Sequence, residues 1–348
     1  MPEKRKLDQV LIEITNHCNL SCKHCYNQGK PLTEMPFETF QYLYNKLDSC
    51  QYDVLFVGGG EPLLHSQLDE FLTFFSAHQD KSFVFATNGL LLTPQFVDAC
   101  ERAGNVFIQI SVDGLTKEVY EQQRGVETFD KFKNAIDLIS NSNIRNKFAR
   151  TCITALNYKQ TSDIYAYLAD RNIRPSFLFA TRQGNAIENW DSLELSVVQK
   201  LHVINELVRM DQKYGIGISI PMPVSKCNFS EECIIRSLAI DTQGYVTPCQ
   251  LYYNKPIGNL LTDSLSDIDN SPILAARKRL AQQRKQRLGN SKECLACGLK
   301  KNCGYGCIGI AEEWGDPWQL DGDCAYRRGY YASIKMGLIT RPENNIKK

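Results

Sequence analysis

Three cysteines lie close together near the start of the chain. Cys18, Cys22 and Cys25 stand in "HCNLSCKHCYN" at residues 17–27, with the spacing Cys-x3-Cys-x2-Cys. Structural zinc takes four protein ligands, whereas an iron–sulfur cluster held by three thiolates keeps one iron with an open coordination position. The loop therefore predicts a cluster that binds a further ligand, and the alternative is a zinc site completed by His17 or His24.

Eight further cysteines lie between residues 227 and 324. They are Cys227, Cys233, Cys249, Cys294, Cys297, Cys303, Cys307 and Cys324. Eight thiolates suffice for two closed four-cysteine sites, which hold either iron–sulfur clusters or zinc ions. Cys100 and Cys152 fall in apolar patterns, where a buried cysteine behaves as a small hydrophobe. Cys152 would instead be a hydrogen-atom donor if it faced the interior of a barrel.

Composition narrows the class of protein. The 348 residues include 14 cysteines and carry 40 basic against 39 acidic residues, a net charge of +1. This balance indicates no nucleic-acid partner, and no apolar run reaches the roughly 20 residues that cross a membrane. The start "MPEKRKLDQV" lacks the apolar core of a signal peptide, so we expect a cytoplasmic protein whose cysteines bind metal.

Apolar β-branched runs alternate with amphipathic stretches up to about residue 180. The predicted strands are 9–15, 53–58, 82–87, 106–112, 150–156 and 175–180. The predicted helices between them are 36–50, 66–79, 94–103, 128–142 and 160–171. Six βα units of this kind predict an α/β fold, a partial (β/α)6 barrel of the TIM type.

Chemically versatile residues follow four successive predicted strands. The cysteine loop follows the first strand, and "GGGEPLL" with Gly59, Gly60, Glu61 and Pro62 follows the second. Asn88 follows the third strand, and Ser111 and Asp113 end the fourth. The carboxyl ends of parallel strands form one rim, so these segments predict an active site there.

The periodicity changes after about residue 190. A helix is predicted at 193–213 and another at 325–337, and the Cys- and Gly-rich region between them needs metal ligation for stability. The basic run 276–287 predicts a solvated helix face. We expect a barrel at 1–190, a connecting helix and linker at 191–225, a cysteine-rich domain at 226–327 and a C-terminal helix and tail at 328–348.

Cys-x3-Cys-x2-Cys followed by Tyr26 resembles the signature of the radical S-adenosylmethionine (SAM) enzymes. The resemblance implies that the Gly59–Pro62 segment holds the SAM amino group, with Glu61 accepting from the ammonium. It implies that Asn88, Ser111 and Asp113 bind the ribose or neighbouring polar groups. Arg124 would pair with the SAM carboxylate, its alternative being a surface salt bridge. Tyr26 would stack beside adenine, its alternative being simple packing.

The C-terminal array, with Gly244 between Cys233 and Cys249, resembles the SPASM domain of peptide-modifying radical SAM enzymes. This resemblance implies two auxiliary clusters. One takes Cys227, Cys233, Cys249 and Cys307, and the other takes Cys294, Cys297, Cys303 and Cys324. The interleaving of Cys307 and Cys324 rests on the resemblance alone.

The resemblance implies SAM and three [4Fe–4S] clusters as cofactors. An electron donor such as flavodoxin or ferredoxin reduces the first cluster, and SAM is cleaved to methionine and a 5′-deoxyadenosyl radical. The radical takes a hydrogen atom from a ribosomally made peptide. Two auxiliary clusters imply that a second electron leaves the peptide, which favours an oxidative C–C, thioether or ether cross-link.

Three alternatives stay open at this point. Anaerobic sulfatase-maturing enzymes share the cluster-ligand arrangement, but their proposed general base is an aspartate at the position where this chain has Gln250. An amide side chain cannot act as a general base at neutral pH. Peptide epimerisation is redox neutral and needs a hydrogen donor. A non-catalytic iron–sulfur electron carrier would have no need of a SAM site. The first strand starts about nine residues into the chain, so we expect leader recognition by a separate protein or by the SPASM region, with the run 276–287 assisting an acidic leader.

Overall fold

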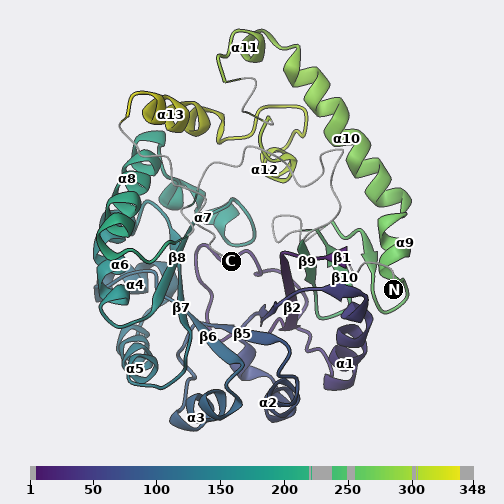
Figure 1. Ribbon diagram of the computed structural model, residues 1–348. Coiled ribbons are helices and arrows are strands. Elements are labelled where there is room, and N and C mark those ends of the chain that lie inside the picture. Colours follow the sequence, from purple (N-terminus) through teal and green to yellow (C-terminus); the bar gives the residue numbers. More distant parts are fainter. Residues whose placement is uncertain are drawn as a thin grey trace.

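The computed structural model describes residues 5–218, 221, 237–248, 255–299, 303 and 305–337. Its centre is a nine-stranded sheet with the order β11-β10-β9-β2-β4-β5-β6-β7-β8 (Figure 1). The six strands of the barrel are β2 (Gln9–Thr15), β4 (Val54–Gly59), β5 (Ser82–Thr87), β6 (Val106–Ser111), β7 (Lys147–Ile153) and β8 (Arg174–Phe179). Each pairs in parallel with the next. The predicted partial barrel is confirmed.

Helices follow the strands and cover the outside of the sheet (Figure 1). Those predicted between the strands are α1 (Phe37–Lys46), α2 (Leu68–Ala77), α3 (Pro94–Ala103), α5 (Phe129–Ser140) and α6 (Thr161–Ala169). A further helix, α4 (Lys117–Arg124), precedes α5 and was not predicted. Short elements complete this half: β1 (Arg5–Lys6), β3 (Cys50–Gln51) and the 3-10 turns η1 (Leu47–Ser49), η2 (Pro62–Leu64) and η3 (Tyr158–Gln160).

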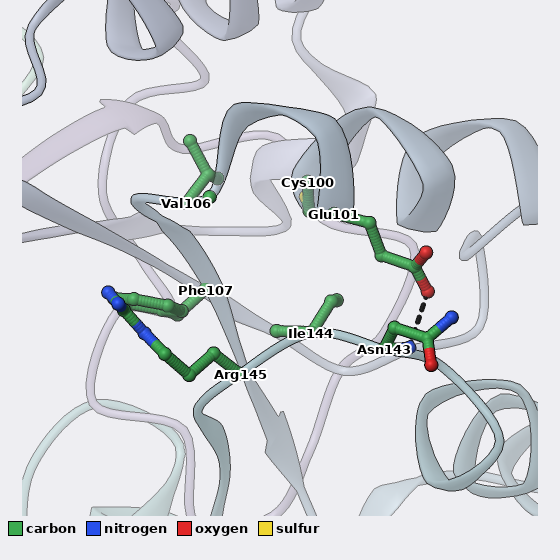
Figure 2. Close-up of a pocket in the computed structure, with 8 residues that line it drawn as sticks. Cys100, Glu101, Val106, Phe107, Asn143, Ile144 and Arg145 are labelled. Carbon is green, nitrogen blue, oxygen red and sulfur yellow. Dashed lines mark hydrogen bonds between the residues drawn. The ribbon is translucent and has the colours of Figure 1, made fainter.

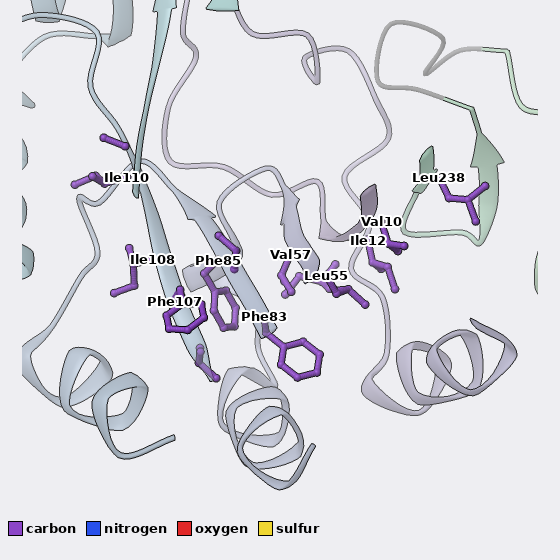
Figure 3. Close-up of a cluster of buried hydrophobic side chains, with 14 of the residues drawn as sticks. Val10, Ile12, Leu55, Val57, Phe83, Phe85, Phe107, Ile108, Ile110 and Leu238 are labelled. Carbon is purple, nitrogen blue, oxygen red and sulfur yellow. The ribbon is translucent and has the colours of Figure 1, made fainter. Parts of the chain in front are cut away.

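The hydrophobic core lies between the sheet and the helices. Side chains alternate across a strand, so every second residue of β2, β4 and β5 points to the helices. Figure 3 shows these residues, including Val10, Ile12, Leu55, Val57, Phe83 and Phe85. The opposite face carries Glu13, Gln109 and Arg150 among its residues, so the interior of the barrel is more polar than the apolar strands suggested.

Strand β7 is displaced toward the N-terminus of the prediction, which placed it at 150–156. The strand ends at Ile153 because Asn157 folds back onto it. The Asn157 amide nitrogen donates to Cys152 O at 2.9 Å, and its oxygen accepts from Thr154 N at 2.8 Å. These bonds take the backbone groups that a longer strand would have used for pairing.

The C-terminal part begins with α7 (Ala186–Leu193), which was not predicted, and α8 (Val197–Tyr214), which corresponds to the helix predicted at 193–213. The Ser196 side chain caps α8 and sets its start. Strand β9 (Ser237–Ile240) pairs in parallel with β2, and β10 (Tyr245–Thr247) and β11 (Gly258–Asn259) continue the sheet. Helices α9 (Leu265–Asp269), α10 (Pro272–Gly289), α11 (Lys292–Leu295) and α12 (Ile308–Glu313) follow. The closing helix α13 (Cys324–Lys335) lies against α8 (Figure 1). Over the described ranges, no helix combines the length and apolarity that crossing a membrane requires.

Buried arginines hold the cysteine-rich region together. Arg284 of α10 is 3% exposed and donates to the carbonyls of Tyr305, Pro317 and Gln319 at 2.7–2.9 Å. Arg327 of α13 is buried against Asp321. The prediction of a solvated face for the basic run is therefore wrong at Arg284, because this guanidinium satisfies carbonyls of a region that has few apolar side chains.

Candidate functional site

The cysteine loop follows β2 at the rim of the barrel. Cys18 is exposed, Cys22 is buried, Cys25 is intermediate, and all three are free thiols. Cys25 N donates to Cys22 O at 3.1 Å, which closes a turn between the two cysteines. Burial raises the pKa of Cys22 to about 12, so this residue forms a thiolate only with help from a cation.

The donor set of the loop fits an iron–sulfur cluster with one open iron position. Cys18, Cys22 and Cys25 are three free thiols on one short loop, and in such a cluster each thiolate binds a separate iron atom. Structural zinc takes a fourth protein ligand, and of the two histidines that could supply it, His24 has its Nε2 3.4 Å from Asp113 Oδ2.

The segment after β8 clamps the cysteine loop, and sequence reasoning missed it. Asn185 N donates to Cys25 O at 2.9 Å, and Asn185 Nδ2 donates to Cys22 O at 3.1 Å. A Cβ at Gly184 would lie 2.3 Å from Cys25 O, so only glycine permits this approach. In the sequence, the only sign of this contact was the glycine at position 184. The last strand of the barrel thus positions the loop that follows the first.

The glycines of the "GGEP" segment serve the packing of the chain itself. Gly59 has a φ of +114°, and a Cβ there would lie 2.2 Å from Thr15 O. A Cβ at Gly60 would lie 2.1 Å from His17 O. The backbone between β2 and the cysteine loop therefore crosses directly over these residues. This contact, and not room for a cofactor alone, explains the glycines.

We predict that Gly60→Ala destabilises the protein by about 3 kcal/mol, because the new methyl group would meet backbone and not a movable side chain. Gly58→Ala is the matched control. A Cβ at Gly58 would lie 3.3 Å from the Leu11 side chain, which can yield. Urea-induced unfolding followed by circular dichroism measures both variants. Equal midpoints for the two would contradict this explanation of the motif.

Glu61 is 1% exposed and ties the end of β4 to the end of β5. Its carboxylate accepts from Thr87 Oγ1 at 2.7 Å, Asn88 N at 2.7 Å and Leu63 N at 3.2 Å. Burial raises the pKa of Glu61, whereas these donors act to lower it. The Asn88 side chain donates to Asn19 Oδ1 at 2.8 Å, one residue from Cys18. Pro62 is buried at the start of η2. Binding of an ammonium by Glu61 stays a prediction.

Asp113 and Arg124 form a buried ion pair beside the cysteine loop. Asp113 is 0% exposed and Arg124 is 7% exposed, and Arg124 Nε donates to Asp113 Oδ2 at 2.6 Å. Arg124 Nη1 lies 3.9 Å from Cys22 Sγ. Because both side chains are buried, the alternative prediction that Arg124 forms a surface salt bridge is wrong. Thr116 caps α4, the helix that carries this arginine inward.

Tyr26 is held by a residue that sequence reasoning did not single out. Its hydroxyl donates to Glu13 Oε1 at 3.3 Å, and Lys30 Nζ lies 2.6 Å from Glu13 Oε2. Glu13 is 4% exposed on β2, so its charge is neutralised within the site. Tyr26 is thus anchored by its hydroxyl, and stacking beside adenine stays a prediction for its ring.

Strand β7 contributes Arg150 and Cys152 to the same region. Ser111 of β6 pairs in register with Arg150. Arg150 Nε is buried without a hydrogen-bond partner among the described residues. Burial raises the pKa of the Cys152 thiol, and the charges of Asp113 and Cys22 act on it as neighbours. Arg150 thus brings a cation into the barrel, and an arginine in a strand was the signal for it.

Three cysteines of the C-terminal array, Cys294, Cys303 and Cys324, lie near one another in the structure. Burial raises the pKa of Cys324, and Cys303 and Cys294 lie close enough to raise it further. Cys297 N donates to Cys294 O at 3.2 Å. Cys307 is buried at the start of α12, and its backbone N–H donates to Asp321 at 2.8 Å. The ligands predicted with Cys307 are Cys227, Cys233 and Cys249, which lie outside the described residues.

A pocket shown in Figure 2 lies away from this site. It is lined by the end of α3, the start of β6 and the segment before β7, including Glu101, Phe107 and Arg145. Asn143 N donates to Glu101 at 2.6 Å. The pocket sits at the amino ends of the strands, opposite the rim where a barrel places its chemistry.

Two family profiles and several curated relatives match the chain. The radical SAM superfamily matches residues 12–168, and SPASM, an iron–sulfur cluster-binding domain, matches residues 227–298. The mycofactocin maturase MftC of Mycolicibacterium smegmatis is 26% identical over 96% of this chain and 86% of its own length. The sporulation killing factor maturation protein SkfB of Bacillus subtilis is 30% identical over 77% of this chain and 66% of its own length.

Solved structures share the fold. The structure of anSMEcpe with bound AdoMet has a TM-score of 0.74 at 17% identity, over 97% of this chain and 99% of that one. Streptococcus suis SuiB bound to S-adenosylmethionine has a TM-score of 0.70 at 15% identity, over 92% and 77%. The two matched domains show that the chain belongs to the radical SAM superfamily and carries a SPASM domain, and they imply S-adenosylmethionine and [4Fe–4S] clusters as its cofactors.

Proposed function

We propose that this enzyme is a peptide maturase that abstracts a hydrogen atom from a ribosomally made peptide and installs an oxidative cross-link. The proposal rests mainly on the set of residues that the structure brings together at one rim of the barrel. There three free cysteines lie beside the "GGEP" segment and the buried Asp113–Arg124 pair. A non-catalytic electron carrier would have no use for that second set of residues.

The cysteine loop would hold the SAM-binding cluster through Cys18, Cys22 and Cys25. When bound there, the reduced cluster would supply one electron, and SAM, on accepting it, would supply the 5′-deoxyadenosyl radical with methionine as the other product. Arg124 lies 3.9 Å from Cys22 Sγ and carries the charge that a buried thiolate needs. Asp113 holds that guanidinium in place through its Nε, which leaves other N–H groups of Arg124 for the SAM carboxylate.

The interior of the barrel would orient the rest of SAM. Glu61 fixes the backbone at Asn88, and Glu13 fixes Tyr26 and Lys30 at the mouth. Arg150 offers a second cation whose Nε has no partner within the described ranges. The hydrogen bonds of Glu61 and Glu13 would keep the reacting atoms in one arrangement, and the buried site would keep water out.

Peptides are the substrates that the relatives favour. MftC and SkfB are named as maturation proteins, and SuiB has been solved bound to its precursor peptide SuiA with a TM-score of 0.69 to this chain. We infer that this chain also acts on a peptide. Leader recognition by a separate protein, and reduction by a flavodoxin or ferredoxin, belong to the same proposal.

The SPASM domain would provide the exit for the second electron. The proximity of Cys294, Cys303 and Cys324 supports their predicted place in one auxiliary cluster. Arg327 lies beside Cys303 and Cys324, where its charge stabilises thiolates. Oxidation of the peptide then needs no oxidant beyond these clusters and the proteins that reoxidise them.

Epimerisation is the second candidate, and the position of Cys152 favours it. This thiol lies within electrostatic reach of Cys22, Cys25 and Asp113. A cysteine there could return a hydrogen atom to the peptide radical, with no net oxidation. Sulfatase-maturase chemistry has less support, since the likeness to anSMEcpe at 17% identity shows the fold alone. Gln250 lies outside the described residues.

Mass spectrometry of peptides encoded beside the gene tests the proposal. After anaerobic incubation with enzyme, SAM and dithionite, we expect a peptide that has lost two hydrogens. An unchanged mass with deuterium taken from heavy water would assign epimerisation instead, and Cys152→Ala would then abolish the exchange. Recovery of every peptide unmodified, with SAM cleaved, would contradict the peptide substrate.

A further inference from the structure

An arginine and two tryptophans meet where the barrel faces the cysteine-rich region. Arg182 follows β8, Trp190 lies on α7, and Trp314 ends α12. The Arg182 guanidinium lies 5.1 Å from the centre of the Trp314 ring. The rings of Trp190 and Trp314 are 6.1 Å apart and nearly perpendicular, at 84°. We call these three residues the Arg–Trp cluster.

The cluster holds two buried donors that the described residues leave unsatisfied. Neither Arg182 Nε nor Trp190 Nε1 has a hydrogen-bond partner within the described ranges. Buried donors without partners are uncommon in folded proteins and each costs about 1–3 kcal/mol. Such donors call for an explanation, and a ligand that brings the missing acceptors supplies one.

The charge of Arg182 is also uncompensated. In the described part of the chain, no carboxylate forms an ion pair with Arg182. Glu312, two residues before Trp314, is occupied by Lys255 at 2.5 Å and Arg277 at 2.9 Å. An incoming anion could therefore pair with the Arg182 guanidinium without displacing a carboxylate of the described residues.

The cluster reaches the molecular surface through Trp314, and Arg182 lies two residues from the glycine that packs on the cysteine loop. Trp314 is 41% exposed, so its ring offers a surface to a ligand. A Cβ at Gly322 would lie 3.2–3.3 Å from atoms of this ring, so the ring is supported from behind. Arg182 stands two residues before Gly184, which packs on Cys25. This short stretch of chain links the cluster to the cysteine loop, beside which hydrogen abstraction is proposed.

We propose that the Arg–Trp cluster binds an acidic residue of the substrate peptide. The inference rests on the proposed function and names the substrate class: a peptide with Asp or Glu near the modified residue. Arg182 pairs with the carboxylate, since guanidinium and carboxylate form charge-assisted hydrogen bonds. The indole N–H of Trp190 donates to a carbonyl of the same peptide. Trp314 packs on the side-chain methylenes, and its ring also holds Arg182 in position.

Equilibrium dialysis with two model peptides tests the inference on the reconstituted holoenzyme. The probes are blocked Gly/Ser dodecapeptides that carry either three Glu or three Gln at matching positions. We expect about tenfold tighter retention of the Glu peptide, and Arg182→Gln should remove that preference. Trp190→Phe keeps an aromatic side chain and removes the N–H, so it should weaken both peptides by about threefold.

Arg145→Gln is the matched control. Arg145 also lies over an aromatic ring, at 5.8 Å from the centre of Phe107, but it belongs to the pocket at the opposite end of the strands (Figure 2). The control should keep the full preference for Glu. Equal retention of both peptides by the unmodified enzyme, or an intact preference in Arg182→Gln, would overturn the inference.

The same preparations separate this inference from the proposed function. SAM cleavage is measured without peptide, and it does not depend on the Arg–Trp cluster. Cleavage that persists while the Glu preference is missing overturns the acidic-residue site alone. A Glu preference without any cleavage of SAM supports the site and overturns the proposed function.

Discussion

Replacing Cys18, Cys22 and Cys25 together by alanine is expected to abolish SAM cleavage and to remove about one third of the bound iron. The loop supplies the three thiolates for one of three proposed [4Fe–4S] clusters, so about four of twelve iron atoms depend on it. The auxiliary clusters draw on other cysteines, and the described ones lie beyond α10. Iron and sulfide analysis and chromatography of 5′-deoxyadenosine measure the two effects.

Cys100→Ala serves as the control for this variant. Cys100 is a buried free thiol on α3, remote from the rim, and its removal should leave the iron content and SAM cleavage unchanged. If the triple variant lost all of its iron, the clusters would not be independent. If it kept all of its iron, the cysteine loop would hold none.

Asp113→Asn is expected to lower the free energy of unfolding by about 3 kcal/mol, because it leaves the buried Arg124 cation without a counter-charge. The amide oxygen can still accept from Cys152 N, which donates to Asp113 Oδ1 at 2.7 Å. The amide NH2 then replaces Oδ2 opposite Arg124 Nε, so the loss reports the charge and this one hydrogen bond together. We also expect weaker SAM binding, since Asp113 positions the guanidinium. Urea-induced unfolding and isothermal titration with SAM measure the two effects.

Asp80→Asn is the matched control for Asp113→Asn. Asp80 pairs with Lys81 at 3.1 Å on the surface, and its side chain is 71% exposed. Exposed pairs contribute about 0–1 kcal/mol, so this variant should unfold almost as the unmodified protein does. The double variant Asp113→Asn/Arg124→Gln should be less damaged than the sum of its single changes. Equal losses from Asp113→Asn and Asp80→Asn would contradict the role given to the buried pair.

The barrel could be predicted from the sequence because its strands are apolar runs with glycine or polar residues directly after them. The helix α4 could not, since it is short and polar and depends on the Thr116 cap. The end of β7 depends on Asn157, whose bonds to the strand form only after the chain turns back. Such contacts are tertiary, and a pattern of apolar residues does not contain them.

The cysteines of the site could be predicted from spacing, but their supports could not. Glu13 stands inside an apolar strand, and only the folded barrel shows that it faces Tyr26 and Lys30. The sequence does not distinguish Gly184 from other glycines, because its close approach to Cys25 exists only in the folded chain. Arg284 stands within a basic run and is nevertheless buried, because three carbonyls of the cysteine-rich region face it.

Hydrogen abstraction from a peptide is the central claim, and isotope transfer tests it most directly. A peptide encoded beside the gene is prepared with deuterium at its non-exchangeable C–H positions and incubated anaerobically with enzyme, SAM and dithionite. The mass of the 5′-deoxyadenosine formed is then measured. We predict that it gains deuterium while the peptide loses mass. Formation of 5′-deoxyadenosine without deuterium, beside an unchanged peptide, would contradict the proposed function.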